Sequence, residues 1–126
     1  AQPSQAALTA ARGMLKGVAR LNRELEREGV EPIRIGIGLH AGEAVIGHIG
    51  SAERQEYTAI GDTVNIASRI QELNKDFDTD IIISQAVRQG LGRCVGLHSL
   101  PPVPLKGVGE PLQLFSIDQQ PFVCVT

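Results

Sequence analysis

Apolar residues recur at three- and four-residue steps along the first quarter of the chain. This period is typical of an α-helix that buries one face, and charged residues fill the positions between. Gly29 then provides a helix stop. We therefore predict a helix over about residues 5–28. Its expected buried stripe consists of Leu8, Ala11, Leu15, Val18, Ala19 and Leu25.

The period changes to two after Pro32, where apolar residues alternate with polar residues or glycine as far as Leu39. Such alternation is typical of a strand with one buried face. A second apolar run over residues 44–49 follows a short turn that contains glycine. Two runs around a short turn predict a hairpin, and residues 53–56 are expected to form a polar loop after it.

A second helical pattern begins at Asp62, whose carboxylate suits a helix N-cap. The helix is expected to fray near residues 74–76. Its apolar positions predict the buried side. These positions are Val64, Ala67, Ile70 and Leu73.

Short strands and one brief helix complete the pattern. Ser84 is predicted to cap that helix, which reaches Gly90. Strands are expected over residues 80–83, 94–100 and 112–117, with extended structure over 103–108. This order of elements predicts an α+β fold, a sheet with helices packed on one face. Residues 1–118 are expected to form one domain, and residues 119–126 a tail or linker.

The composition excludes nucleic acid polymers as partners. Aromatic residues make up 3% of the 126 residues and the net charge is −2. Polymer-binding sites need stacking platforms or a broad basic field. A single nucleotide needs only a few local cations, so nucleotide binding stays open.

No apolar run approaches the roughly 20 residues that cross a bilayer, and the first residues do not resemble a signal peptide. Since the chain does not begin with Met, we expect it to be excised from a longer protein. We expect no membrane contact from this segment. The expected location is cytoplasmic, or the cytosolic part of a membrane-associated or multidomain protein.

The cysteines and histidines have structural interpretations. Cys94 and Cys124 lack the spacing of metal ligands. A disulfide between them is possible in principle, but we expect two free thiols, because small disulfide-stapled domains usually carry more cysteines. His40 and His48 are expected to be structural, and His98 has no titratable neighbour that the sequence identifies.

The segment GIGLHA over residues 36–41 matches a dinucleotide-binding fingerprint. That motif has meaning only between a strand and the start of a helix. Here both glycines lie inside a predicted strand, and another strand follows. We therefore interpret Gly36 and Gly38 as positions where a helix packs close to the sheet.

The segment YTAIGDTVNIASR over residues 57–69 carries the strongest candidate chemistry. Asn65 and Arg69 are four residues apart, so they project from one helical face a turn apart. An amide and a guanidinium so placed can bracket a sugar and its phosphate, since the planar guanidinium donates two hydrogen bonds at once. Thr58, just before the turn, can hydrogen-bond a base edge. Taken alone, the pair is usually a solvated helix face.

This whole segment is similar to the signature of class III adenylyl and guanylyl cyclases. Residues 35–50 resemble the hairpin of that family, and LKGVGEP over residues 105–111 resembles its Lys-Gly segment near the end of the domain. The three segments occur in the right order. The resemblance implies a ferredoxin-like class III cyclase fold, truncated at its N-terminal strands.

The resemblance also implies roles for individual residues. Asn65 resembles the asparagine that positions the ribose, and Arg69 the arginine that stabilises charge at the α-phosphate. Lys106 resembles the lysine that contacts the outer phosphates. Thr58 occupies the purine-selecting position, and threonine there resembles the bacterial and bicarbonate-responsive enzymes, which favours ATP. Glu43 departs from members that place an arginine for phosphate at the hairpin turn.

The implied reaction converts ATP to 3′,5′-cyclic AMP and pyrophosphate at a site between two cyclase subunits, here a homodimer. It implies two Mg²⁺ or Mn²⁺ ions, whose aspartate ligands belong to segments outside this chain, so no metal ligand is assigned here. We therefore expect the fragment alone to be inactive. The alternative hypothesis is a non-catalytic, cyclase-like regulatory or dimerisation module.

Overall fold

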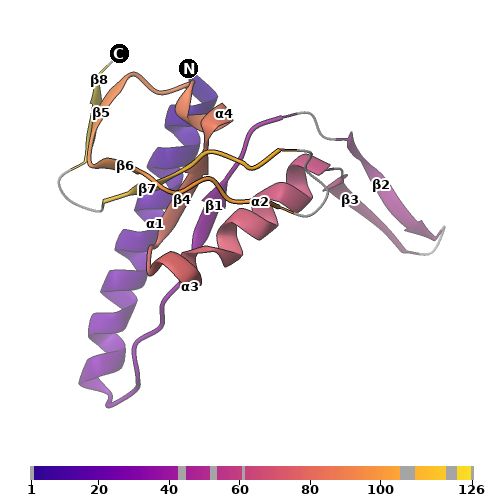
Figure 1. Cartoon of the computed structure of the whole chain (residues 1–126). Coiled ribbons are helices and arrows are strands. Elements are labelled where there is room, and N and C mark those ends of the chain that lie inside the picture. Colours follow the sequence, from indigo (N-terminus) through magenta and orange to yellow (C-terminus); the bar gives the residue numbers. More distant parts are fainter. Residues whose placement is uncertain are drawn as a thin grey trace.

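The computed structural model describes residues 2–42, 45–51, 54–60, 62–105, 110–118 and 122–125. For residues 2, 45–51 and 54–60 the description covers the backbone alone. The elements in chain order (Figure 1) are α1 (Gln2–Arg27), β1 (Ile37–Leu39), β2 (Val45–Ser51), β3 (Arg54–Ile60), α2 (Asp62–Glu72), α3 (Asn74–Phe77), β4 (Ile81–Ser84), α4 (Gln85–Arg88), β5 (Arg93–Val95), β6 (Leu97–Ser99), β7 (Leu114–Ile117) and β8 (Val123–Val125).

A mixed sheet forms the centre of the fold, with strand order β1-β4-β7-β6. β1 runs parallel to β4, whereas β7 is antiparallel to both β4 and β6. All four residues of β4 are buried. A strand covered on both faces is an apolar run without alternation, which explains the three consecutive isoleucines of β4.

The two long helices lie on opposite faces of this sheet (Figure 1). Ile81 and Ile83 belong to the core beneath α1, and Ile82 belongs to the core beneath α2. Successive strand residues point to opposite faces, so β4 contributes to both cores. The α+β class is confirmed, but the expected placement of the helices on one face does not hold for α1 and α2. A strand buried on both faces needs a cover on each.

The buried side of α2 differs from the predicted stripe. Ile70 is fully buried and Ile66 packs beside it, whereas Val64 is 39% exposed. The reason lies at Gly38 in β1. A Cβ there would lie 2.5 Å from the backbone nitrogen of Gln71 and 2.8 Å from the backbone oxygen of Ala67. The helix backbone therefore rests on β1 along the side of Ala67 and Gln71, and this contact sets its rotation.

The predicted hairpin between residues 33–39 and 44–49 is wrong. β1 pairs in parallel with β4, in the register Ile37 to Ile81, and β2 pairs with β3. β1 finds its partner in the buried run of β4, because that pairing closes the core under both helices. The polar residues from Arg54 onward belong to β3 instead of a loop. β2 and β3 form a two-stranded arm that projects away from the sheet (Figure 1).

The end of the chain also differs from expectation. Phe122 is buried and β8 pairs with β5, so residues 122–125 of the expected tail belong to the folded domain. Cys94 and Cys124 lie directly opposite each other in this pair and form a disulfide, which corrects the expectation of two free thiols. Antiparallel pairing places opposite side chains within reach of a bond. Their sequence separation of 30 residues hid this proximity.

We predict that Gly38→Ala destabilises the fold by about 2 kcal/mol, in the range of overpacking a filled core. The atoms nearest the new methyl group are backbone atoms of α2, so no side chain can rotate away to relieve the clash. Urea denaturation monitored by circular dichroism measures the effect.

Gly13→Ala in α1 is the matched control, because nothing lies within 4 Å of a Cβ at that position. It should stabilise the fold by about 0.5–1 kcal/mol through the better helix propensity of alanine. Equal unfolding midpoints for the two variants would contradict the close contact of α2 with β1.

Candidate functional site

The outward side of α2 carries the candidate site. Asn65 is exposed and Arg69 is half-buried. Four residues of helix separate them by about 6 Å along the axis, and residues at this spacing share one face. Arg69 already makes an interaction within this structure. The helix thus presents an amide and a guanidinium one turn apart, as the spacing in the sequence predicted.

The inward side of α2 holds the site rigidly. Ile70 belongs to a buried cluster with Ile82 of β4 and Leu114 of β7, and all three are fully buried. Arg69 directly precedes Ile70, so the guanidinium extends from a backbone that the core holds in place. Together with the close contact at Gly38, this packing leaves α2 little freedom to slide or rotate.

Asn74 anchors the end of α2 to the sheet. The residue is 4% exposed. Its Nδ2 donates to the backbone oxygens of Ile37, at 3.1 Å, and Gln71, at 3.0 Å, while its Oδ1 accepts from Thr79 Oγ1 at 2.8 Å. A buried amide with these bonds satisfied specifies one arrangement of the elements it joins. The sequence pattern predicted Asn74 only as part of the fraying end of the helix. Its buried anchoring role could not be distinguished there from that of an exposed polar residue.

The other predicted site residues are described less fully. Thr58 lies in β3, where its backbone is the register partner of Gly47, but its side chain is outside the described part. Lys106 and Glu43 lie outside the described residues altogether. The structure therefore brings Asn65 and Arg69 together and leaves the expected roles of Thr58 and Lys106 untested.

His40 makes a contact that the sequence did not reveal. Its Nδ1 lies 2.8 Å from Ser84 Oγ, at the point where the parallel strands β1 and β4 both end. Ser84 also caps α4, as predicted, and accepts from the backbone nitrogen of Val87. Burial lowers the pKa of the His40 imidazole, which favours the neutral form at neutral pH. These contacts agree with the structural role expected for His40.

His98 has a titratable neighbour, contrary to expectation. Its Nε2 lies 2.8 Å from Oδ2 of Asp118, and both side chains are exposed. His98 is in β6, and Asp118 directly follows the paired strand β7. Strand pairing brings the two groups together across 20 residues of sequence. An exposed pair of this kind contributes little to stability.

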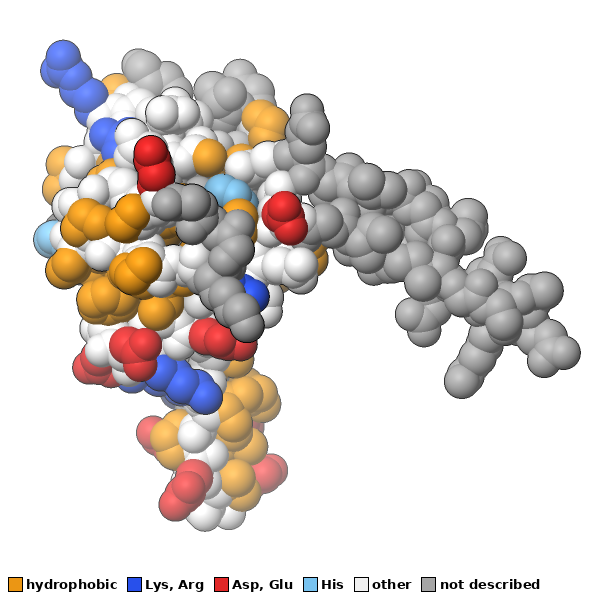
Figure 2. Space-filling model, turned by 45° about the vertical axis from the view of Figure 1, so that its right-hand side comes forward, with side chains coloured by type: hydrophobic (Ala, Val, Ile, Leu, Met, Phe, Trp, Pro, Cys, Tyr) orange, Lys and Arg blue, Asp and Glu red, His pale blue; other side chains and the backbone are white. Residues whose placement is uncertain are grey.

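The charged groups form no single large field on the visible face. Figure 2 shows Lys and Arg side chains interspersed with Asp and Glu over that face. Within the described residues, no group of three or more His, Cys, Asp or Glu side chains could hold a metal ion. No helix in the described part is long and apolar enough to cross a membrane.

Comparison with known proteins identifies the kind of domain. The sequence model of the adenylate and guanylate cyclase catalytic domain matches residues 2–118. The chain is 36% identical over 96 residues to adenylate cyclase 1 of Rhizobium meliloti (strain 1021). This match covers 76% of this chain and 14% of that protein. The chain is also 34% identical over 119 residues to the adenylate cyclase of Anabaena cylindrica. This match covers 88% of this chain and 24% of that protein.

Solved structures show the same fold. The guanylyl cyclase Cya2 superposes with a TM-score of 0.73 at 27% identity, over 90% of this chain and 57% of that chain. The adenylyl cyclase CyaB from P. aeruginosa gives a TM-score of 0.76 at 24% identity, over 91% and 58% of the two chains. The chain thus spans less than a quarter of the length of these two curated relatives and under three fifths of these solved chains. From the match over residues 2–118, the chain belongs to the adenylate and guanylate cyclase catalytic domain family.

Proposed function

We propose that this chain supplies the ribose- and phosphate-binding half of an adenylyl cyclase site. The observation that carries the proposal is the outward face of α2, where exposed Asn65 and half-buried Arg69 stand one turn apart on a helix held by the packing of its inward side. Catalytic groups act best when the surrounding structure fixes them before the substrate arrives. The proposed chemistry therefore needs α2 to be held rigidly against the sheet, as its packing holds it.

In the proposed site, Arg69 acts on the α-phosphate of ATP. Its planar guanidinium can donate two hydrogen bonds to phosphate oxygens. Negative charge grows on these oxygens in the transition state, so a positioned cation lowers the barrier more than it tightens ground-state binding. Asn65, about 6 Å away along α2, hydrogen-bonds the ribose and aligns its 3′-hydroxyl with the phosphorus.

Two further residues complete the nucleotide contacts. Lys106 places a compact ammonium group near the outer phosphates, where it stabilises the departing pyrophosphate. Thr58 hydrogen-bonds the purine edge and favours adenine. Since ATP is the proposed substrate, we also propose that the domain works in the cytosol.

The proposed reaction balances as an intramolecular displacement. The ribose 3′-oxygen forms a bond to the α-phosphorus and releases its proton to solvent, and the bond between that phosphorus and the bridging oxygen of pyrophosphate breaks. A second subunit, as a homodimer partner, would hold the other side of the nucleotide. The Mg²⁺ or Mn²⁺ ions implied by the family resemblance would need ligands from outside the described residues, so we assign these ions no step.

The first test measures cyclic AMP formation by the intact protein carrying Arg69→Ala. We predict at least about a hundredfold loss of turnover number with a smaller change in KM, on the scale of removing one transition-state donor. A loss below about threefold would contradict the role of Arg69.

Arg23→Ala is the matched control, since Arg23 is an exposed arginine on α1 and should leave turnover within about twofold. An intact protein that makes no cyclic AMP with magnesium or manganese would instead favour the regulatory or dimerisation module.

A second test concerns purine choice. We predict that Thr58→Ala lowers the ratio of kcat/KM for ATP to that for GTP by about tenfold, the value of one directional hydrogen bond at a base edge. Steady-state assays with both nucleotides measure this ratio. Thr79→Ala is the control, because Thr79 bonds Asn74 at the far end of α2. An unchanged ratio in Thr58→Ala would show that Thr58 does not contribute to purine choice.

A further inference from the structure

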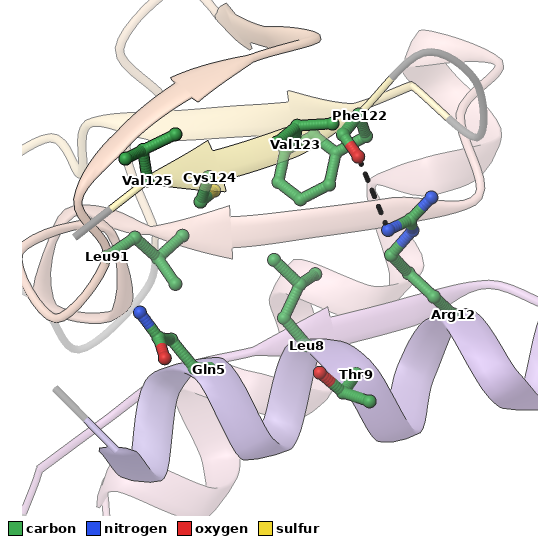
Figure 3. A pocket seen from close by; sticks show the side chains of 9 residues that line it. All are labelled: Gln5, Leu8, Thr9, Arg12, Leu91, Phe122, Val123, Cys124 and Val125. Carbon is green, nitrogen blue, oxygen red and sulfur yellow. Dashed lines mark hydrogen bonds between the residues drawn. The ribbon is translucent and has the colours of Figure 1, made fainter.

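A groove of about 520 Å³ lies between the first half of α1 and the last strand of the chain (Figure 3). Leu8 and Arg12 of α1 line one side, and Phe122 and Cys124 line the other. Figure 3 shows the Phe122 ring lying over the groove above Leu8, with the Arg12 guanidinium beside it. The C-terminal segment thus forms one wall of this groove.

Phe122 is part of the main core beneath α1. It is 7% exposed and belongs to the buried cluster that contains Leu8 and Leu91. The guanidinium carbon of Arg12 lies 5.1 Å from the centre of the Phe122 ring, and Arg12 Nη1 donates to the Phe122 carbonyl oxygen at 3.5 Å. Removing Phe122 from this place would expose apolar surface on α1 and at Leu91.

The non-covalent attachment of β8 is small. Among the described strands, β8 pairs only with β5, and each of these strands has three residues. Val95, Val123 and Val125 are 57–64% exposed, so the outer face of this ribbon gains little from burial. A short, isolated two-stranded ribbon is marginal in water. The Cys94–Cys124 bond is the covalent link that joins its two strands.

We propose that Cys94 and Cys124 form a reversible oxidation site that controls whether the C-terminal strand stays on α1. The disulfide ties β8 to β5 and holds Phe122 in the core. After reduction, the short ribbon, the packing of Phe122 and the Arg12 contacts still hold the segment, but no covalent link supports them, and the segment then opens locally. Both cysteines are half-buried, which leaves them within reach of small thiols.

The chemistry requires a thiol reductant, such as glutathione or a dithiol protein. Its thiolate attacks one sulfur of the pair, which gives a mixed disulfide and releases the other cysteine as a thiolate. A second thiol then attacks the mixed disulfide. In total, two electrons and two protons convert one S–S bond to two S–H groups, and the reductant becomes a disulfide.

The reversible character of the bond rests partly on the proposed function. A domain that consumes ATP in the cytosol meets thiols that keep most cysteines reduced, and cytosolic disulfides are usually transient or redox-sensing. The placement of the bond supports the same conclusion. It joins the two strands of a ribbon that is separate from the central sheet, so its loss opens a local unit without unfolding that sheet.

The switch is separate from the candidate site. Phe122 packs in the cluster on the α1 face of the sheet, whereas Ile70 of α2 packs on the other face. Reduction should therefore change the α1 groove and leave the face that carries Asn65 and Arg69 in place. This separation lets hydrogen exchange follow the switch without reference to cyclase activity.

The test uses the intact protein with and without dithiothreitol. Mass spectrometry of unreduced peptides should find Cys94 linked to Cys124. Hydrogen exchange of residues 5–12 should then become at least about tenfold faster after reduction, because this part of α1 loses its cover. Exchange of residues 66–72 of α2 should stay unchanged. Titration in glutathione buffers should convert the linked form to the dithiol and back.

The double variant Cys94→Ser/Cys124→Ser is the control. Its exchange should match that of the reduced protein and ignore dithiothreitol. Phe122→Ala should speed exchange of residues 5–12 even with the bond intact. The proposal is overturned if no Cys94–Cys124 link is found, if exchange of residues 5–12 does not respond to reduction, or if the link survives strongly reducing glutathione. A lack of cyclase activity would change none of these expected results, so the switch and the proposed function are tested separately.

Discussion

The backbone of α2 rests directly on β1 at Gly38, and the arrangement of the candidate site depends on this contact. No residue with a Cβ fits there without moving the helix. The close approach sets the rotation of α2, which buries Ile70, partly buries Ile66 and turns Asn65 outward. Asn74 then ties the end of the helix to the same strand through hydrogen bonds of its buried amide. The lack of a side chain at Gly38 therefore decides which groups α2 presents outward.

The central sheet connects two regions with different roles. The three isoleucines of β4 point alternately to the core under α1 and the core under α2. The α2 face carries the groups proposed to act on ATP, and the α1 face carries the groove closed by Phe122. A close-packed sheet keeps these faces in a fixed relation, while the disulfide acts on an edge ribbon outside it. The proposed chemistry and the proposed redox control can therefore vary independently.

The family assignment and the geometry of α2 support each other in different ways. The match to the family covers residues 2–118 and so includes both long helices and the central sheet. It identifies the kind of domain, but the chain spans a small share of its curated relatives. Exposed Asn65 and half-buried Arg69 on one face of α2 add a local physical basis for the proposed nucleotide chemistry. The family match alone does not indicate which side of α2 carries the site.

Local pattern in the sequence was enough for the long first helix, the start of α2, the cap at Ser84 and the pairing of Asn65 with Arg69 on one face. Each of these depends on residues within one or two turns of each other, and their spacing is visible along the chain. The partner of β1, the exposure of Val64, the bond between Cys94 and Cys124 and the contact of His98 with Asp118 were decided by tertiary structure. Each joins segments that are distant in sequence or depends on which face a neighbouring element covers. Only the packing of the whole domain specifies such contacts, because local period and propensity do not identify the partner.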